Sequence, residues 1–425
     1  MPADPQPDEE FEADLARAFD EAAHEVRSVA DPLVVGGLAR GRARRRRRRI
    51  ATITGSCVAL AVLAGGGLAA NVLSGPQPVA SSQALTVADR STPPPPHLDK
   101  GMNILLIGLA TAKAPDGSAP PDSFVRDQLH AGSEAVEGLD RTDTLLVLHF
   151  PADGGPASGL SVPRDVWAQS AGLDGRAYPV GSVYAVAEAA TTAKLKGQGP
   201  TADQVAERGR EAGRAATIAT VQQLLGVPID HFAEFDLAGF YDIAKAIGPI
   251  DVCVTHATQD RASGADLKQG LNTLDPAQAL AFVRQRHGVD DGSDLARTRR
   301  QQAFIASALH TLRDQGVFDE LSKAQKLFAA VGGDLVADQG WNPLDLLQHG
   351  GGLLDGRATL RTLPVGQATV EQDGVQTGMG YHVDPAVVRG VAQSVLSDAG
   401  ASATSATSAP GSGAAGGAHG GAASP

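Results

Sequence analysis

Charged residues on one face of a helix-forming segment are the first sign of chemistry in this sequence. Ser293 or Asp294 can cap this helix. At about 100° per residue, Asp294 and Arg297 fall on one stripe, which continues through Gln301, Ile305, Ala308 and Leu309. Arg299 and Arg300 fall off the stripe, and we expect both to face solvent. Charges on a core-facing stripe are costly unless paired or used. The pattern therefore predicts either a buried structural ion pair or an anion site in which guanidinium groups converge on a phosphate.

A second pair of arginines lies just upstream, at the end of another helix-forming segment. Residues 275–278 carry an aspartate, a proline at the first helical position and a glutamine, in the spacing of a capping box. On a regular helix Arg284 and Arg286 would point in different directions. They can share a target only if the helix unwinds there, which Gly288 and the turn-like residues 290–292 favour.

Polar residues also stand at the ends of strand-like apolar runs. Residues 145–150 form one such run, preceded by Asp143, and residues 159–162 form another, followed by Pro163, Arg164 and Asp165. In open α/β sheets, ligands bind at such strand ends. Mg²⁺ takes one or two carboxylates together with phosphate oxygens, so Asp143 is a candidate magnesium ligand. An aspartate at this kind of position is also a common cap or turn residue.

Strand-like and helical segments alternate along the chain. The strand-like segments are residues 102–108, 145–150, 159–162, 227–232, 250–254 and 358–363. The helical segments are residues 202–225, 237–247, 321–335, 343–354 and 385–396. This alternation predicts an α/β fold with helices on both faces of a sheet.

Composition and charge restrict the class of protein. The chain has 425 residues, 42% of them hydrophobic, and a net charge of −12, so the protein as a whole is not an obvious nucleic-acid binder. Positive charge is concentrated in the arginine run 44–49, directly before the uncharged apolar residues 50–73. That segment is long enough to cross a bilayer, and the arginines favour a cytoplasmic N-terminus.

Two other interpretations of this N-terminal pattern are a nucleic-acid or nuclear-localisation patch and a cleaved signal peptide. The first ignores the adjoining apolar segment, and the second is disfavoured by the long leader and the long apolar core. We therefore expect a cytoplasmic, disordered and basic tail over residues 1–49, a transmembrane helix over 50–73 and a Pro/Ser-rich linker over 74–100. An extracytoplasmic domain would follow over 101–400, and a disordered Ala/Gly/Ser tail over 401–425.

Several motifs occur together in a familiar order. They are MNILLIG, RTDT before a strand, SVPRD after one, GVPIDHFAEFDLAGFYDIAKAIGPIDVCV and LDPAQALAFVRQRHGVDDGSDLARTRRQQ. Over about residues 101–395 the sequence resembles the LytR-CpsA-Psr family of cell-wall glycopolymer transferases, in its actinobacterial form. The resemblance implies an α-β-α sandwich with a central mixed sheet, whose sheet and helices enclose an apolar groove for a lipid.

The resemblance also implies a function. Family members are membrane-anchored phosphotransferases that move a glycopolymer from a polyprenyl diphosphate carrier to a hydroxyl of peptidoglycan, with the help of Mg²⁺. Transferred to this sequence, Asp143 would be a magnesium ligand or orient one. The diphosphate would be bound by Arg164, Arg284, Arg286 and Arg297, with Asp294 and Gln301 in support. Asp165 would be a candidate base for the acceptor hydroxyl, or a partner that orients Arg164 through a salt bridge.

The sequence departs from the family at Ala110, where members often carry a second metal-binding aspartate. Two further functions remain open beside the transferase, the second of them because of Ala110. One is hydrolysis of the lipid diphosphate with water as the acceptor. The other is a non-catalytic protein that binds a polyprenyl phosphate or the cell wall, or that has a regulatory role.

Overall fold

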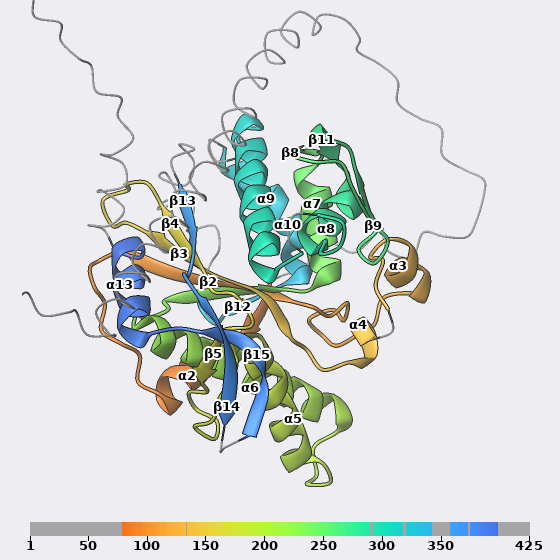
Figure 1. Ribbon diagram of the computed structural model, residues 1–425. Coiled ribbons are helices and arrows are strands. Elements are labelled where there is room, and N and C mark those ends of the chain that lie inside the picture. The colour runs from red at the N-terminus through yellow and green to blue at the C-terminus, as the bar shows by residue number, and fades with distance from the viewer. Residues whose placement is uncertain are drawn as a thin grey trace, which may run out of the picture.

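A seven-stranded mixed sheet forms the centre of the protein (Figure 1). The computed structural model describes residues 79–132, 134–289, 292–317, 320–341, 358–372 and 375–397. The strand order is β1-β12-β7-β2-β3-β4-β13. In that order the strands are Ala80–Ser82, Leu335–Asp338, His231–Phe235, Met102–Leu109, Thr142–Phe150, Ser158–Ser161 and Thr359–Thr362. The predicted α/β class with a central mixed sheet is confirmed.

The central strands are apolar on both faces. β2 pairs antiparallel with β3 and parallel with β7. Because successive side chains of a strand point to opposite faces, Leu105 and Val147 belong to one apolar cluster, and Ile104 and Leu146 belong to another. Both faces of the sheet must therefore be covered to exclude water.

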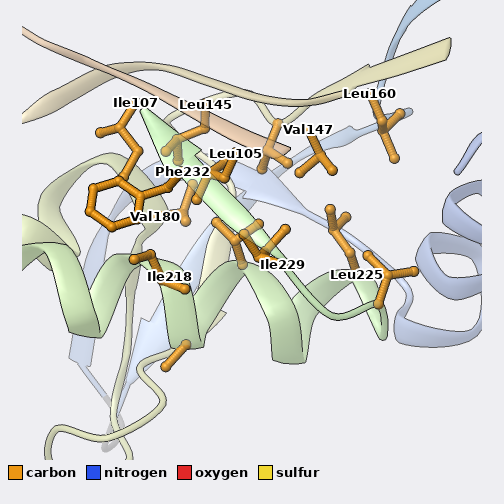
Figure 2. Packing of buried hydrophobic residues seen from close by; sticks show 14 of the residues in the cluster. Leu105, Ile107, Leu145, Val147, Leu160, Val180, Ile218, Leu225, Ile229 and Phe232 are labelled. Carbon is orange, nitrogen blue, oxygen red and sulfur yellow. The ribbon is translucent and has the colours of Figure 1, made fainter. Parts of the chain in front are cut away.

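One face is covered by helices that come from the two ends and the middle of the chain (Figure 1). They are α2 (Ala84–Ser91), α6 (Ala202–Leu225) and α13 (Pro385–Val395), with α5 (Val183–Leu195) packed against α6. Ile218 and Leu225 of α6 lie in the same buried cluster as Leu105 and Phe232 of the sheet (Figure 2). Helix α6 begins at a capping box and ends at Gly226 in the left-handed conformation, as expected for this sequence.

The other face lies beneath α7 (Leu237–Ile247), α8 (Pro276–Arg284), α9 (Asp294–Asp314) and α10 (Leu321–Val331). These helices share a second apolar cluster, in which the rings of Phe240 and Phe304 are 5.1 Å apart. Ile305 of α9 packs with Ile104 and Leu146 of the sheet. Helices therefore lie on both faces, as predicted.

Short hairpins surround this framework. They are β5 (Trp167–Gln169) with β6 (Ala177–Pro179), β8 (Ile250–Val254) with β11 (Gly270–Leu274), β9 (Thr258–Asp260) with β10 (Ala265–Leu267), and β14 (Gly366–Gln372) with β15 (Val375–His382). Residues 250–254 form a strand as predicted, but this strand pairs with β11 outside the central sheet. Two short helices, α3 (Asp122–Asp127) and α4 (Glu134–Glu137), lie in the insert between β2 and β3.

The interpretation of residues 74–100 as an extended linker is wrong for the middle of that range. β1 joins the central sheet by pairing with β12, and α2 places Ala84 and Ala88 in the core without exposed surface. The two alanines are four residues apart, so they lie on one face of a helix. Their pattern is hidden by the proline and serine content of the neighbouring residues.

Some predictions concern residues outside the described part of the chain. These are the transmembrane segment 50–73, the tails 1–49 and 401–425, and the helix at 343–354. Within the described residues, no helix has both the length and the apolar character needed to cross a membrane.

Candidate functional site

The start of α9 brings two charged residues of the predicted stripe into the protein. The Ser293 hydroxyl accepts a hydrogen bond from the backbone N–H of Ala296, so Ser293 is the N-cap and Asp294 is the first helical residue. Asp294 and Arg297 are each only 3% exposed. One turn apart on the helix, they form an ion pair with 2.5 Å between Asp294 Oδ1 and Arg297 Nη2.

Strand β3 and the residues after β4 supply a second ion pair. β3 and β4 are antiparallel, and the register that pairs Leu146 with Ser161 continues so that Asp143 lies opposite Arg164. The Arg164 guanidinium donates to Asp143 Oδ1. Gly181 packs against this arginine so closely that a Cβ atom there would lie 2.7 Å from Arg164 Cβ. The backbone of residue 181 therefore holds Arg164 in place.

The two pairs are joined into one cluster. Arg164 Nε lies 3.4 Å from Asp294 Oδ1 and 3.5 Å from Asp165 Oδ1. Arg297 Nη1 lies 3.6 Å from Asp143 Oδ2, and Arg297 Nη2 donates to the backbone carbonyl of Asp143 at 3.4 Å. Three separate motifs thus contribute to one cluster at the end of the sheet where β3 begins and β4 ends: residues 143, 164, 165, 294 and 297.

The electrostatics of the cluster keep Asp143 ionised. Burial by itself would raise the pKa of Asp143, but the charges of Arg297 and Arg164 outweigh burial and hold its pKa below the ordinary value. Asp294 is affected in the opposite sense, since its burial outweighs the same two arginines and raises its pKa. Burial also lowers the pKa of Arg297.

Buried donors of the cluster lack acceptors within the described residues. Beyond the ion-pair contacts given above, the Nε atoms of Arg164 and Arg297 make no hydrogen bond of good geometry there, and neither carboxylate oxygen of Asp294 accepts one. A buried donor without a partner costs about 1–3 kcal/mol, and more for charged groups. An anion with several oxygens would satisfy such guanidinium groups, which bind phosphate in a bidentate manner.

The arginines around α8 differ in their placement. α8 begins at the predicted capping box and ends at Arg284, and Gln285 is already extended, so the predicted unwinding before Gly288 is confirmed. Arg286 follows two residues later, is half-buried, and its charge contributes to the pKa of both Asp294 and Arg297. Arg284 reaches elsewhere, because its guanidinium donates to the backbone carbonyl of Leu129.

The exposure of three further residues of α9 can be compared with the expectations from the sequence. Gln301 is half-buried one turn after Arg297. Arg299 is exposed, as expected. The expectation that Arg300 faces solvent is wrong, because this arginine is only 7% exposed and donates to the backbone carbonyl of Gln285. The loop after α8 covers that side of α9, which a helical projection of α9 alone does not reveal.

Sequence reasoning did not single out Arg141. It is exposed, stands immediately before β3, and contributes to lowering the pKa of Asp143. Its position two residues before Asp143 in the motif RTDT was a usable signal, since alternate residues of a strand share a face. The cluster therefore has an excess of arginine over aspartate: Arg141, Arg164, Arg286 and Arg297 against Asp143, Asp165 and Asp294.

The residues present fit a magnesium ion only in part. No group of three or more His, Cys, Asp or Glu side chains suited to a metal occurs among the described residues. Mg²⁺ in phosphate sites needs only one or two carboxylates, because phosphate oxygens and waters supply its other ligands. Asp143 meets this requirement, since it is ionised and its Oδ2 atom has only a long contact of 3.6 Å with Arg297.

Fold and site together define a mixed α/β protein with an arginine-rich, carboxylate-lined cluster at one edge of its sheet. The chain belongs to the LytR_cpsA_psr family, whose model matches residues 75–385. The resemblance seen in the sequence motifs is thereby confirmed.

Individual relatives agree with this assignment. The cell wall biosynthesis protein LcpA of Corynebacterium glutamicum is 34% identical over 268 residues, which cover 63% of this chain and 50% of LcpA. A protein of Bacillus mycoides named polyisoprenyl-teichoic acid–peptidoglycan teichoic acid transferase TagU is 27% identical over 202 residues, 48% of this chain and 55% of TagU. The chain thus spans about half the length of these relatives.

A solved structure supports the fold. Protein gbs0355 of Streptococcus agalactiae matches with a TM-score of 0.50 and 18% identity, over 69% of this chain and 86% of that protein. At this identity the match shows the fold alone. The printed names of the two sequence relatives refer to cell wall biosynthesis and to teichoic acid transfer.

Proposed function

We propose that this protein is a membrane-anchored phosphotransferase that moves a glycopolymer from a polyprenyl diphosphate to a hydroxyl of peptidoglycan, forming a phosphodiester. The observation that carries the proposal is the set of buried guanidinium donors, Arg164 Nε and Arg297 Nε, that make no hydrogen bond within the described residues, Arg164 Nε having only the long ion-pair contacts with Asp165 and Asp294. A diphosphate supplies such acceptors in number. The relative from Bacillus mycoides is named as a transferase acting between a polyisoprenyl-linked teichoic acid and peptidoglycan.

In this proposal the arginines bind the diphosphate and stabilise negative charge as the phosphorus is attacked. Phosphoryl transfer needs little covalent chemistry from the protein, so positioning and charge stabilisation supply most of the rate. Asp143 and the diphosphate would hold Mg²⁺, which neutralises phosphate charge when bound. Asp294 fixes the direction of Arg297 through the 2.5 Å ion pair.

Asp165 has two roles open to it. Its Oδ1 atom lies 3.5 Å from Arg164 Nε, which supports the orienting salt bridge. It is also partly exposed beside the cluster, so it can accept a proton from an incoming hydroxyl.

The lipid would lie along the face of the sheet that carries α7, α9 and α10. Apolar side chains there remain partly exposed, including Leu106 on the sheet, Ile305 on α9 and Phe240 on α7. An isoprenoid chain covering such surface would remove it from water. The apolar residues 50–73 would anchor the chain in the same membrane as the lipid carrier, with the described domain outside the cell.

The test is an incubation of the purified protein with a polyprenyl-diphosphate oligosaccharide, peptidoglycan fragments and Mg²⁺, followed by mass spectrometry. The proposal predicts a product in which sugar and peptidoglycan are joined through one phosphate, together with the polyprenyl monophosphate. Free sugar phosphate without joined product would establish a hydrolase. Tight binding of the lipid without any product would establish a non-catalytic binding or regulatory protein, the role that the missing aspartate at Ala110 leaves open.

A further inference from the structure

The loop that follows α8 is fixed by a residue outside the site described above. Asp260 stands at the end of β9 and is only 4% exposed. Its Oδ2 atom accepts hydrogen bonds from the backbone N–H groups of Arg286, at 3.1 Å, and His287, at 3.2 Å. Its Oδ1 atom accepts from the N–H of Ala262 at 3.0 Å. This carboxylate therefore binds the backbone of the loop at the residue whose side chain lies beside the arginine cluster.

The chemistry of these contacts requires a negative charge on Asp260. Burial would raise its pKa, but the hydrogen bonds from the N–H groups of Arg286, His287 and Ala262 outweigh burial and lower the pKa to about 2. Backbone donors aimed at one carboxylate are charge-assisted and stronger than neutral hydrogen bonds. The loop is thus held by a permanently ionised acceptor at any physiological pH.

Further contacts fix the same loop from both sides. The Gln285 side-chain amide donates to Thr258 Oγ1, and Thr258 Oγ1 donates to the carbonyl of Gly288 at 2.8 Å. Gly288 has φ = 67°, and a Cβ atom at this residue would lie 2.9 Å from the carbonyl oxygen of Gln259. On the opposite side, Arg300 donates to the Gln285 carbonyl. The loop therefore rests directly on β9.

This arrangement explains how two arginines separated by one residue point to different places. Arg284 is still helical and donates to the Leu129 carbonyl. Arg286 follows the break, and its charge acts on Asp294 and Arg297. The position of residue 286 therefore depends on where the backbone of residues 285–288 is held.

We propose that Asp260 is a positioning residue for the diphosphate site: by binding the N–H groups of Arg286 and His287 it keeps α8 from continuing and aims the Arg286 guanidinium at the diphosphate. The inference rests on the proposed function and adds to it a residue that contacts no substrate. Asp260 acts only through Arg286, and this dependence makes the inference testable.

The test is a double-mutant cycle with Asp260→Asn and Arg286→Ala, read out by the affinity for farnesyl diphosphate and by kcat/KM for glycopolymer transfer. Asparagine has a similar shape, but it turns an N–H₂ group or a weaker acceptor toward the backbone donors. Asp260→Asn should weaken farnesyl diphosphate binding and lower kcat/KM, each about 10-fold or more. In the Arg286→Ala background the same change should have an effect of less than about 3-fold.

Two variants serve as controls. Asp266→Asn removes the same charge from an exposed side chain on β10 of the same hairpin, so it should leave binding and transfer unchanged. Asp260→Glu keeps the acceptor charge and should restore most of the affinity. If Asp260→Asn does not fold, Asp260→Ser enters the cycle in its place, and Asp260→Glu remains the rescue control.

The outcomes separate the two proposals. Equal effects of Asp260→Asn with and without Arg286 would overturn the positioning role, because a general loss of structure does not depend on one arginine. Absence of farnesyl diphosphate binding by the unmodified protein would overturn it as well. Coupled effects on binding in a protein that transfers no glycopolymer would support the positioning role and refute only the proposed reaction.

Discussion

Replacement of Arg297 by alanine is the most informative single change, because this side chain contacts two of the three carboxylates of the cluster. It pairs with Asp294 at 2.5 Å and lies 3.6 Å from Asp143. Arg297→Ala removes a guanidinium whose Nε has no acceptor among the described residues. The change therefore affects both the stability of the fold and the charge available to a bound diphosphate.

The two effects have different expected sizes. Loss of a buried, charge-assisted contact to a diphosphate should cost about 2–4 kcal/mol of transition-state stabilisation, a rate decrease of about 30- to 1000-fold. Removing one partner of a buried ion pair costs about 3–5 kcal/mol in stability when nothing else compensates. Here Arg164 Nε remains 3.4 Å from Asp294 Oδ1, so we expect a smaller loss, about 2 kcal/mol.

The assay is glycopolymer transfer by purified variants, with folding checked by circular dichroism and urea unfolding. Arg299→Ala is the matched control, since this arginine is exposed two residues further along α9 and should change activity by less than about 3-fold. Arg297→Ala combined with Asp294→Asn removes the unpaired carboxylate, so it should recover stability without recovering transfer.

Three results would refute this reasoning. If Arg297→Ala transfers glycopolymer at the unmodified rate, the diphosphate does not bind at this cluster. If the double variant recovers transfer together with stability, Arg297 has only a structural role. If Arg299→Ala is as damaging as Arg297→Ala, burial on α9 does not identify the functional residues.

Three further predictions follow from other parts of the chain. The backbone N–H of Ala110 donates to the Arg141 carbonyl at 2.8 Å, so Ala110 lies beside the start of β3. Ala110→Asp should therefore lower the Mg²⁺ concentration for half-maximal transfer. An unchanged Mg²⁺ titration would show that Asp143 and the diphosphate suffice. Burial raises the pKa of Asp236 to about 8, so the folded state binds the proton of this carboxyl group more tightly than the unfolded state. The resulting contribution to stability is lost as pH rises from about 4 to about 8. Asp236→Asn should reduce this loss of stability by about 1.4 kcal/mol for each unit of pKa shift. The free energy of unfolding, measured in urea at pH 5 and pH 8.5, checks this. The same pH dependence in the variant and the unmodified protein would contradict it. A reporter enzyme that works only outside the membrane, fused after Pro425, should be active in cells, whereas activity of a cytoplasmic reporter at the same position would overturn the proposed topology.

Local sequence signals predicted much of the fold. Helix α6 and helix α7 have the predicted bounds because each has a clear N-cap and a glycine directly after its last residue. The capping box at Asp275 and Gln278 is present, and the helix that it starts unwinds before Gly288. These features depend on residues close together in the chain, so the sequence contains the information directly.

Features that depend on distant partners were harder to predict. The helix predicted over residues 321–335 ends at Val331, and residues 335–338 instead form β12, because β1 and β7 lie on its two sides. Such a short strand has no stable structure without its neighbours. The burial of Arg300 has the same origin, since it depends on the loop after α8.

The sequence predicted those contacts of the site that lie within a single motif. The pairing of Asp294 with Arg297 follows from helical spacing alone. The contact of Arg164 with Asp143 needs the register between β3 and β4, which no local pattern specifies. The contacts of Asp260 with the loop after α8 require tertiary structure, so no local pattern in the sequence selects Asp260.

The most direct test of the central claim is a structure of the protein with a polyprenyl diphosphate and Mg²⁺. We predict the diphosphate oxygens within hydrogen-bond distance of Arg164, Arg286 and Arg297, with the Nε donors of Arg164 and Arg297 then satisfied. A diphosphate bound away from these arginines, with the ion pairs among Asp143, Arg164, Asp294 and Arg297 unchanged, would contradict the account.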